Sequence, residues 1–186
     1  MSNPSLVVLL VEDEHHEMLV YKYLRRCGLK SREIRIPPYP IGKGSAQAWV
    51  LSRFAEEAGE CRNRQAGAKA ETALVVMIDA DARTVEYRLA QLDQALVDGG
   101  EVKVRKAERI VRLVPKRNVE TWILCLSGET ELDQDTDYTR EKHKWHDLIP
   151  TAAETLREWT RPKGELPAHC VSSLRLGVQE LKRLDS

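Results

Sequence analysis

Two short apolar runs, each ending abruptly in carboxylates, constrain the fold of this chain more than any other feature. The first is LVVLLVEDE, which ends in Glu12, Asp13 and Glu14, and the second is ALVVMIDAD, which ends in Asp79 and Asp81. Continuous runs of Val, Leu and Ile indicate strands that are covered on both faces, as in a parallel sheet. Helical patterns separate these runs, so we predict an α/β protein with a mostly parallel central sheet and helices on both faces.

The predicted strands and helices alternate along the 186 residues. Strands are predicted over residues 5–11, 33–36, 73–78 and 110–114. Helices are predicted over residues 14–27, 45–61, 83–97, 119–126, 151–159 and 172–184. The segments 63–72 and 129–147 are expected to be a polar loop and an irregular excursion over the surface. We expect a catalytic domain over residues 1–128 and, over 129–186, a helical extension packed on the same domain.

The carboxylates that follow the two runs predict a metal site. Ligands bind at the carboxyl edge of open parallel sheets. If the two strands are neighbours, Glu12, Asp79 and Asp81 converge there, and like charges repel unless a hard cation such as Mg²⁺ or Mn²⁺ lies between them. In an extended backbone, Asp79 and Asp81 point to the same side around Ala80. The plainer interpretation is that an acidic residue after a strand caps the next helix. For either cluster taken alone, this interpretation has the same weight as a metal site.

The histidines and cysteines indicate no site of their own. His15 and His16 point about 100° apart on a helix, and HHEM is not the HExxH of a metallopeptidase, so both are expected on the surface of the first turn. Cysteine spacing is irregular, without a CxxC pair, so neither a zinc ribbon nor a disulfide framework is indicated. Reduced thiols, some of them buried, are therefore expected at Cys27, Cys61, Cys125 and Cys170.

Charge and hydropathy limit the partners. The chain has 29 Lys and Arg against 29 Asp and Glu, which argues against coating nucleic acid by bulk electrostatics. No stretch approaches the ~18 apolar residues of a membrane span. The Met-Ser-Asn-Pro start lacks the basic and apolar regions of a signal peptide, so a cytoplasmic protein without a membrane partner is expected.

One segment, residues 101–117, is locally basic and could follow a phosphate backbone. The alternative, of equal weight, is a solvated amphipathic face. The candidate nucleic-acid contacts are Lys43, Lys103, Arg105, Lys106, Arg109 and Arg117.

The segment LVPKRNVETWIL, residues 113–124, places a base and an acid where the chain leaves a strand. Pro115 ends the strand and Asn118 can cap the next helix. Lys116 is a candidate for neutralising a phosphate or a leaving group, and Glu120 for completing the metal shell or orienting Lys116. The plainer interpretation is an ion pair between Lys116 and Glu120 at positions i and i+4.

Together VVLLVE, ALVVMIDAD and PKRNVETW resemble the TOPRIM domain of topoisomerases, bacterial primases and overcoming-lysogenization-defect (OLD) nucleases. The likeness is greatest to compact TOPRIM-like proteins of phage defence and abortive infection, and it spans residues 6–126. It implies a three-layer Rossmann-like fold, with Glu12 as a metal ligand or general acid/base and with Asp79 and Asp81 as ligands of Mg²⁺ or Mn²⁺. The chain has no GxxxxGK[ST] loop, so ATP hydrolysis would come from a separate ATPase of the ABC or AAA type.

Two alternatives remain open. The start of the chain is also similar to a phosphoacceptor receiver domain, although the 66 positions from Asp13 to Asp79 exceed compact βαβαβ spacing. The other alternative is a catalytically silent TOPRIM-like subunit that binds a partner ATPase or nucleic acid.

The favoured hypothesis is a metal-dependent nuclease, in which Glu12, Lys116 and Glu120 are catalytic and the cation is Mg²⁺ or Mn²⁺. The expected partners are DNA or RNA, an ATPase subunit and a second copy of the chain.

Overall fold

Four parallel strands form the centre of the protein in the computed structural model, which describes residues 4–38, 45–67, 71–140 and 144–185. The strands are β1 (Leu6–Val11), β2 (Ile34–Arg35), β3 (Thr72–Met77) and β4 (Ile110–Leu113). Their order in the sheet is β2-β1-β3-β4, and every pair is parallel. The predicted α/β class and parallel sheet are confirmed.

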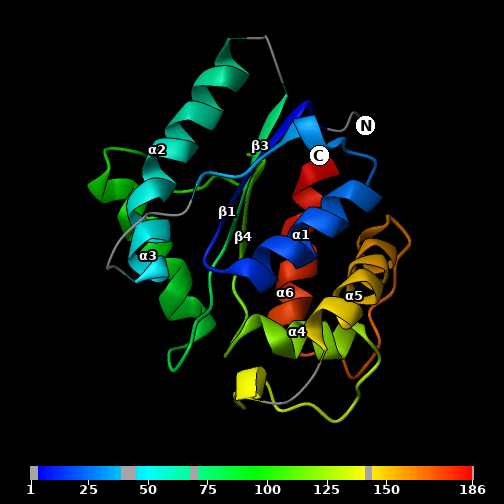
Figure 1. The fold of residues 1–186 in the computed structure, drawn as a ribbon. Helices are drawn as coiled ribbons and strands as arrows, with labels where there is room; N and C mark the ends of the chain where they lie inside the picture. Colours follow the sequence, from blue (N-terminus) through cyan, green and yellow to red (C-terminus); the bar gives the residue numbers. More distant parts are fainter. Residues whose placement is uncertain (1–3, 39–44, 68–70, 141–143, 186) are drawn as a thin grey trace.

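Helices cover both faces of this sheet (Figure 1). They are α1 (Glu14–Arg26), α2 (Ala46–Ala66), α3 (Val85–Asp98), α4 (Val119–Leu126), α5 (Trp145–Thr160) and α6 (Ser172–Leu181). Short 3₁₀ turns add η1 (Ser31–Glu33), η2 (Tyr138–Arg140) and η3 (Lys182–Asp185). In Figure 1, α2 and α3 lie on one side of the sheet and α1, α4, α5 and α6 on the other, with α5 outermost, which gives the three-layer Rossmann-like arrangement.

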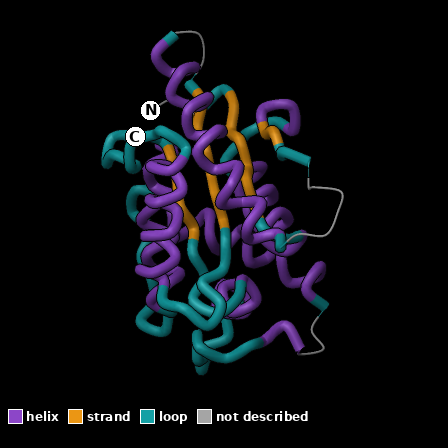
Figure 2. Tube along the Cα trace, turned by 90° about the vertical axis from the view of Figure 1, so that its left-hand side faces the viewer, coloured by secondary structure: helices purple, strands orange, loops and turns teal. Residues whose placement is uncertain are grey.

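The alternation of side chains along β1 divides the apolar core in two. Val7 and Leu9 pack in the cluster beneath α1, α4, α5 and α6, whereas Val8 and Leu10 pack in the cluster beneath α2 and α3. Figure 2 shows the strands side by side with helices around them. Burial on both faces explains why the sequence of this strand is a continuous apolar run.

Residues 129–186 contribute to the same core as the preceding residues. Ile149 and Leu156 of α5, and Leu174 and Val178 of α6, lie in one cluster with Leu19 of α1. Helix α6 packs on β4, and α5 packs on α1 and α4. The extension therefore completes one layer of the fold.

A glycine on α6 makes room for a tryptophan side chain from α4. Gly177 faces the fully buried Trp122, whose Nε1 donates a hydrogen bond of 2.9 Å to Ser173 Oγ. A Cβ at position 177 would lie 2.3 Å from Cη2 of Trp122. Only glycine fits this contact without displacing the indole.

Gly177→Ala is therefore expected to lower the free energy of unfolding by about 1–2 kcal/mol, because overpacking outweighs the ~1 kcal/mol gain in helix propensity. Urea denaturation measures the change. The control is Gly67→Ala, whose Cβ would meet only ordinary contacts of 3.5 Å or more. Equal stability of both variants would contradict the packing argument.

Two helix boundaries differ from the prediction. Helix α2 runs to Ala66, so part of the predicted loop 63–72 is helical; Gln65 anchors it by donating to the backbone oxygen of Thr72 at 2.7 Å. Helix α5 begins at Trp145, before the predicted start, and contains Pro150. Proline is a poor residue for a helix interior, but the buried stripe that includes Ile149 and Ala153 overrides its preference.

The described part of the chain has no helix that is both long and apolar enough to cross a membrane. All four cysteines are free thiols, and three of them are buried, as expected.

Candidate metal centre

The two acidic clusters meet at the carboxyl edge of the sheet, because β1 and β3 are neighbours in register from Leu6 and Thr72 to Val11 and Met77. Glu12 directly follows β1 and Asp79 lies two residues beyond β3. The backbone N–H of Asp79 donates to Glu12 Oε2 at 3.1 Å. The predicted convergence of these two carboxylates is confirmed.

Asp13 interacts with α1, and Glu14 with α5. Asp13 is the N-cap of α1, and its Oδ1 accepts a hydrogen bond of 3.0 Å from the backbone N–H of His16. Glu14 is the first residue of α1 and lies 3.5 Å from Nε2 of His146 on α5. The helix-cap interpretation is thus correct for Asp13, and only Glu12 of this cluster faces Asp79.

His16 joins the two clusters. Its ring is completely buried, with Nε2 2.9 Å from Asp79 Oδ1 and Nδ1 2.8 Å from Asp13 Oδ1. One ligand atom from each of Glu12, His16 and Asp79 falls within 4.8 Å of the others. The expectation of a surface histidine is wrong at this position, because α1 starts so soon after β1 that its first turn lies against the sheet edge.

Burial and the neighbouring charges shift the pKa values of this group. Burial by itself would lower the pKa of His16, but the charges of the neighbouring Asp79 and Asp13 carboxylates raise it well above 6.5. Burial tends to raise the pKa of Asp13, yet the interactions with His16 lower it to about 2. Burial raises the pKa of Asp79 to about 7 against the opposing effect of His16, and it also raises the pKa of Glu12. The imidazolium form of His16 is therefore favoured, and it is a donor on both nitrogens.

The donor set fits a hard cation. The contact between His16 Nε2 and Asp79 Oδ1 orients Asp79, as hydrogen-bonded neighbours of metal ligands commonly do. Each carboxylate keeps an oxygen beyond its hydrogen bond, Glu12 Oε1 and Asp79 Oδ2. Carboxylate oxygens are the preferred ligands of Mg²⁺ and Mn²⁺.

Asp81 does not point to the same side as Asp79, and the expectation that it would is wrong. Its φ angle is 55°, and Arg83 N–H donates to the backbone oxygen of Ala80 at 2.9 Å, so a turn ends the extended backbone there. The Asp81 carboxylate is half exposed and accepts hydrogen bonds from Gln47 of α2 and Arg88 of α3. Asp79 faces α1, whereas Asp81 faces the helices of the opposite layer.

Lys116 and Glu120 lie at this edge but are not paired with each other. Lys116 forms an ion pair with Asp135. Glu120 is buried in the first turn of α4, and its Oε1 lies 2.6 Å from Nδ1 of His15. The side chain of Asn118 occupies the N-cap position without capping the helix, and instead donates to Asp137 at 3.0 Å. Sequence reasoning missed the pair of His15 and Glu120, because the 105 positions between them carry no local signal.

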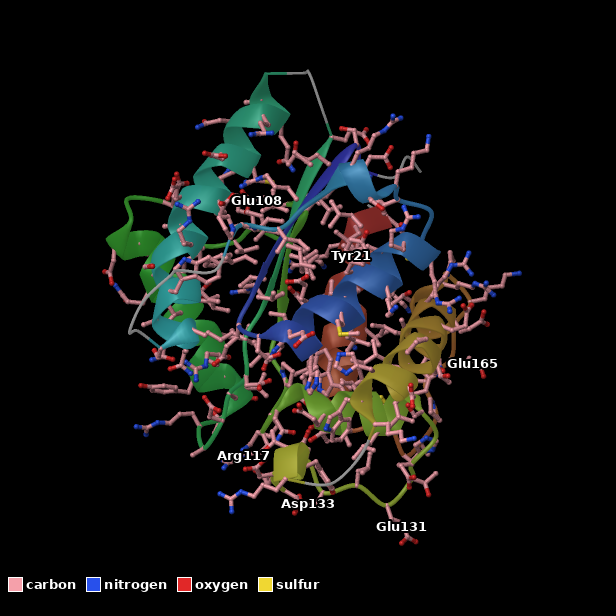
Figure 3. All side chains as sticks on the ribbon, viewed as in Figure 1. Tyr21, Glu108, Arg117, Glu131, Asp133 and Glu165 are labelled. Atoms are coloured by element: carbon pink, nitrogen blue, oxygen red, sulfur yellow. The ribbon has the colours of Figure 1, made fainter. Side chains whose placement is uncertain are left out.

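The basic residues are divided between the two ends of the sheet. Lys103, Arg105, Lys106 and Arg109 precede β4 and lie at its amino end, away from the carboxylates, whereas Arg117 follows β4 and lies at the carboxyl end. Figure 3 shows Glu108 in the upper half of the molecule and Arg117 near the lower end. Lys43 lies outside the described residues.

The loop before β4 is held in place by Arg62 of α2. Its Nη1 donates to Glu101 at 2.7 Å, and its Nε and Nη2 each donate to Glu108 at 3.0 Å. Lys103, Arg105 and Lys106 are exposed on this loop. They form an ordered basic surface, but one separate from the candidate metal centre.

Known proteins provide no further assignment. No family model, curated protein or solved structure matches the chain. The likeness to TOPRIM domains therefore stays a prediction from the motifs. The geometry of the site is therefore the basis for a proposed function.

Cation binding at this centre is expected to weaken as the pH falls through about 7, the pKa of Asp79. A carboxylate must lose its proton to ligate a metal, so the proton competes with the cation below this pH. The apparent affinity for Mn²⁺ should fall by about tenfold per pH unit there. Calorimetric titration on both sides of pH 7 measures the change, and an affinity independent of pH would contradict the assignment of Asp79 as a ligand.

Proposed function

We propose that this chain is a metal-dependent nuclease of the TOPRIM type, which hydrolyses phosphodiester bonds of DNA or RNA. The observation that carries the proposal is the meeting of Glu12 and Asp79 at the carboxyl edge of two adjacent parallel strands. Ligands of open α/β sheets bind at this edge. Mg²⁺ is commonly held by one or two carboxylates, with water and substrate phosphate completing its coordination.

The proposed roles follow from the contacts of each side chain. A bound cation supplies positive charge beside the reacting phosphate and Lewis acidity at its oxygens. His16 holds Asp79 in a fixed orientation through the hydrogen bond from Nε2. Lys116, paired with the exposed Asp135, is available to offset charge on the leaving oxygen, and Glu120 orients the ring of His15.

Cleavage assays with the full chain test this proposal. Plasmid, single-stranded DNA and tRNA are incubated with Mg²⁺ or Mn²⁺, and with a chelator as the control. Cleavage that requires the cation supports the nuclease. Cation binding without cleavage of any substrate would instead favour the catalytically silent subunit.

The strand order favours one second candidate, the receiver domain. The order β2-β1-β3-β4 is also that of the first four strands in flavodoxin-like sheets. Against a phosphoacceptor role, Asp79 is buried and hydrogen-bonded to His16. Incubation with acetyl phosphate or beryllofluoride, followed by intact-mass measurement or tryptophan fluorescence, separates the candidates, since stoichiometric modification at Asp79 or Asp81 would favour the receiver.

Because its motifs resemble those of phage-defence proteins, we extend the proposal: the chain would be the effector of a phage-defence system and would work with a separate ATPase.

If the exposed loop before β4 contacts a phosphate backbone, changing Lys103, Arg105 and Lys106 to Gln should weaken nucleic-acid binding about equally for all sequences. Each lost contact should reduce the salt slope by about one. Salt-dependent titrations measure this, and the matched control changes the exposed Arg32, Lys163 and Lys182 to Gln, which removes the same number of charges. Unchanged nucleic-acid binding with loss of co-purifying ATPase would assign the loop to the partner instead.

A further inference from the structure

Arg88 on α3 has a guanidinium that is buried with few partners. The residue is 2 % exposed. Its Nη1 donates to Gln91 at 2.7 Å, and its Nη2 lies 3.3 Å from Asp81 Oδ2. Its Nε is buried without a hydrogen-bond partner among the described residues. Buried charges are normally paired at short distance and fully hydrogen-bonded, so this one is poorly compensated.

Among the described residues, Asp81 is the one carboxylate that contacts this guanidinium, and it lies on the solvent side. Its side chain is 54 % exposed, and it shares Oδ2 between Arg88 and Gln47. Its φ of 55° lies in the left-handed region, which is uncommon for a residue other than glycine. A half-exposed side chain in a turn can move away without opening the apolar core, and its departure would open Nη2 to solvent.

The guanidinium lies at the carboxyl edge of the sheet, in the second turn of a helix that begins just after β3. Asp79 is two positions before Asp81 and faces the opposite layer. An anion held by Arg88 would therefore approach the edge that carries the candidate metal centre. The planar fork of arginine matches the oxygens of a phosphate, with which it forms paired hydrogen bonds.

We propose that Arg88 is a phosphate-binding residue that Asp81 covers in this structure, and that a phosphate replaces the Asp81 carboxylate on the guanidinium. The phosphate is either that of a nucleic-acid backbone or a free phosphate group. The first source rests on the proposed nuclease function and identifies Arg88 as the residue that positions the substrate. The second source is independent of that function.

Another ion pair of the same helix provides a matched control. Asp93 of α3 pairs with Arg112 of β4 at 2.7 Å, and both side chains are largely buried. This pair is 0.6 Å shorter than the contact between Arg88 and Asp81, and Arg112 is in the middle of the strand rather than at its carboxyl end. Nε of Arg112 is, like that of Arg88, buried without a hydrogen-bond partner among the described residues, so the two guanidinium groups differ in their place relative to the carboxyl end of the sheet. If that place makes the anion site, releasing Arg112 should not create one.

The experiment measures binding of inorganic phosphate and of a short oligothymidylate to the full chain in the presence of a chelator, so that no cation contributes. The variants are Asp81→Asn, Asp93→Asn and Asp81→Asn combined with Arg88→Gln. Asp81→Asn is expected to tighten phosphate binding about tenfold, since it removes the competing carboxylate. Asp93→Asn should leave binding as in the wild type, and Arg88→Gln should abolish the gain.

If the double variant with Arg88→Gln does not fold, as circular dichroism would reveal, Arg88→Lys replaces it. Lysine keeps the charge but lacks the fork, so most of the gain should still disappear. An equal gain from Asp81→Asn and Asp93→Asn, or a gain that survives both changes at Arg88, would overturn the proposal. Tight binding of phosphate but not of the oligonucleotide would support the site and assign it to a free phosphate, and would then count against a nucleic-acid substrate.

Discussion

Asp79→Asn is expected to reduce cation-dependent cleavage by about 100-fold or more, since even neighbours of metal ligands change activity 10- to 100-fold. The substitution replaces an anionic ligand by a neutral amide of the same shape. It also retains an oxygen that can accept the hydrogen bond from Nε2 of His16. The loss should therefore report the missing ligand rather than a damaged fold.

Asp79→Ala would be a poorer test, because it would leave the buried ring of His16 with Asp13 as its remaining carboxylate. Asp93→Asn is the matched control for Asp79→Asn, since it removes a partly buried, ion-paired carboxylate on α3 that is not part of the candidate metal centre. Cleavage and Mn²⁺ binding are measured together with circular dichroism. Cutting at the wild-type rate by a folded Asp79→Asn variant would refute the metal-dependent mechanism.

The second large effect is expected on stability, at His16. His16→Ala should lower the free energy of unfolding by about 3–5 kcal/mol, because it leaves a cavity in place of a fully buried ring and removes the partner of the Asp13 and Asp79 carboxyl groups. His146→Ala is the control. That histidine is exposed and lies 3.5 Å from Glu14, so its loss should change stability by no more than ~0.5 kcal/mol.

The pH dependence of this difference identifies its origin. A raised pKa of His16 in the folded state contributes stability that is fully present below pH 6.5 and is lost as the pH rises through the folded pKa. The lowered pKa of Asp13 contributes stability that is present above pH 3.8 and is lost as the pH falls toward 2. Urea denaturation across this range should therefore show the largest difference between wild type and His16→Ala from pH 3.8 to 6.5. A difference that does not depend on pH would assign the effect to packing alone.

The fold follows from local features of the sequence. The apolar runs at Leu6–Val11 and Thr72–Met77 are continuous because both faces of each strand are buried, and this pattern is readable without any long-range information. The sequence predicts that the two acidic clusters converge only if the first and third strands are neighbours. In the sheet β1 and β3 are indeed adjacent. The boundaries of α2 and α5 were less predictable, since contacts far along the chain override the preferences of Gln65 and Pro150.

The convergence of the Glu12 and Asp79 carboxylates is predictable from the sequence because each follows an apolar strand, and the carboxyl ends of neighbouring parallel strands share one edge. The sequence could not determine which side chains would form hydrogen bonds or ion pairs with these carboxylates. His16 contacts both Asp13 and, 63 positions along the chain, Asp79. A turn with a positive φ diverts Asp81 toward Arg88. Sequence alone therefore determined the strands and the acidic edge, whose signals are local. Only the tertiary structure decided the partners of each charge, because those depend on the packing of α1 and α3 on opposite faces of the sheet.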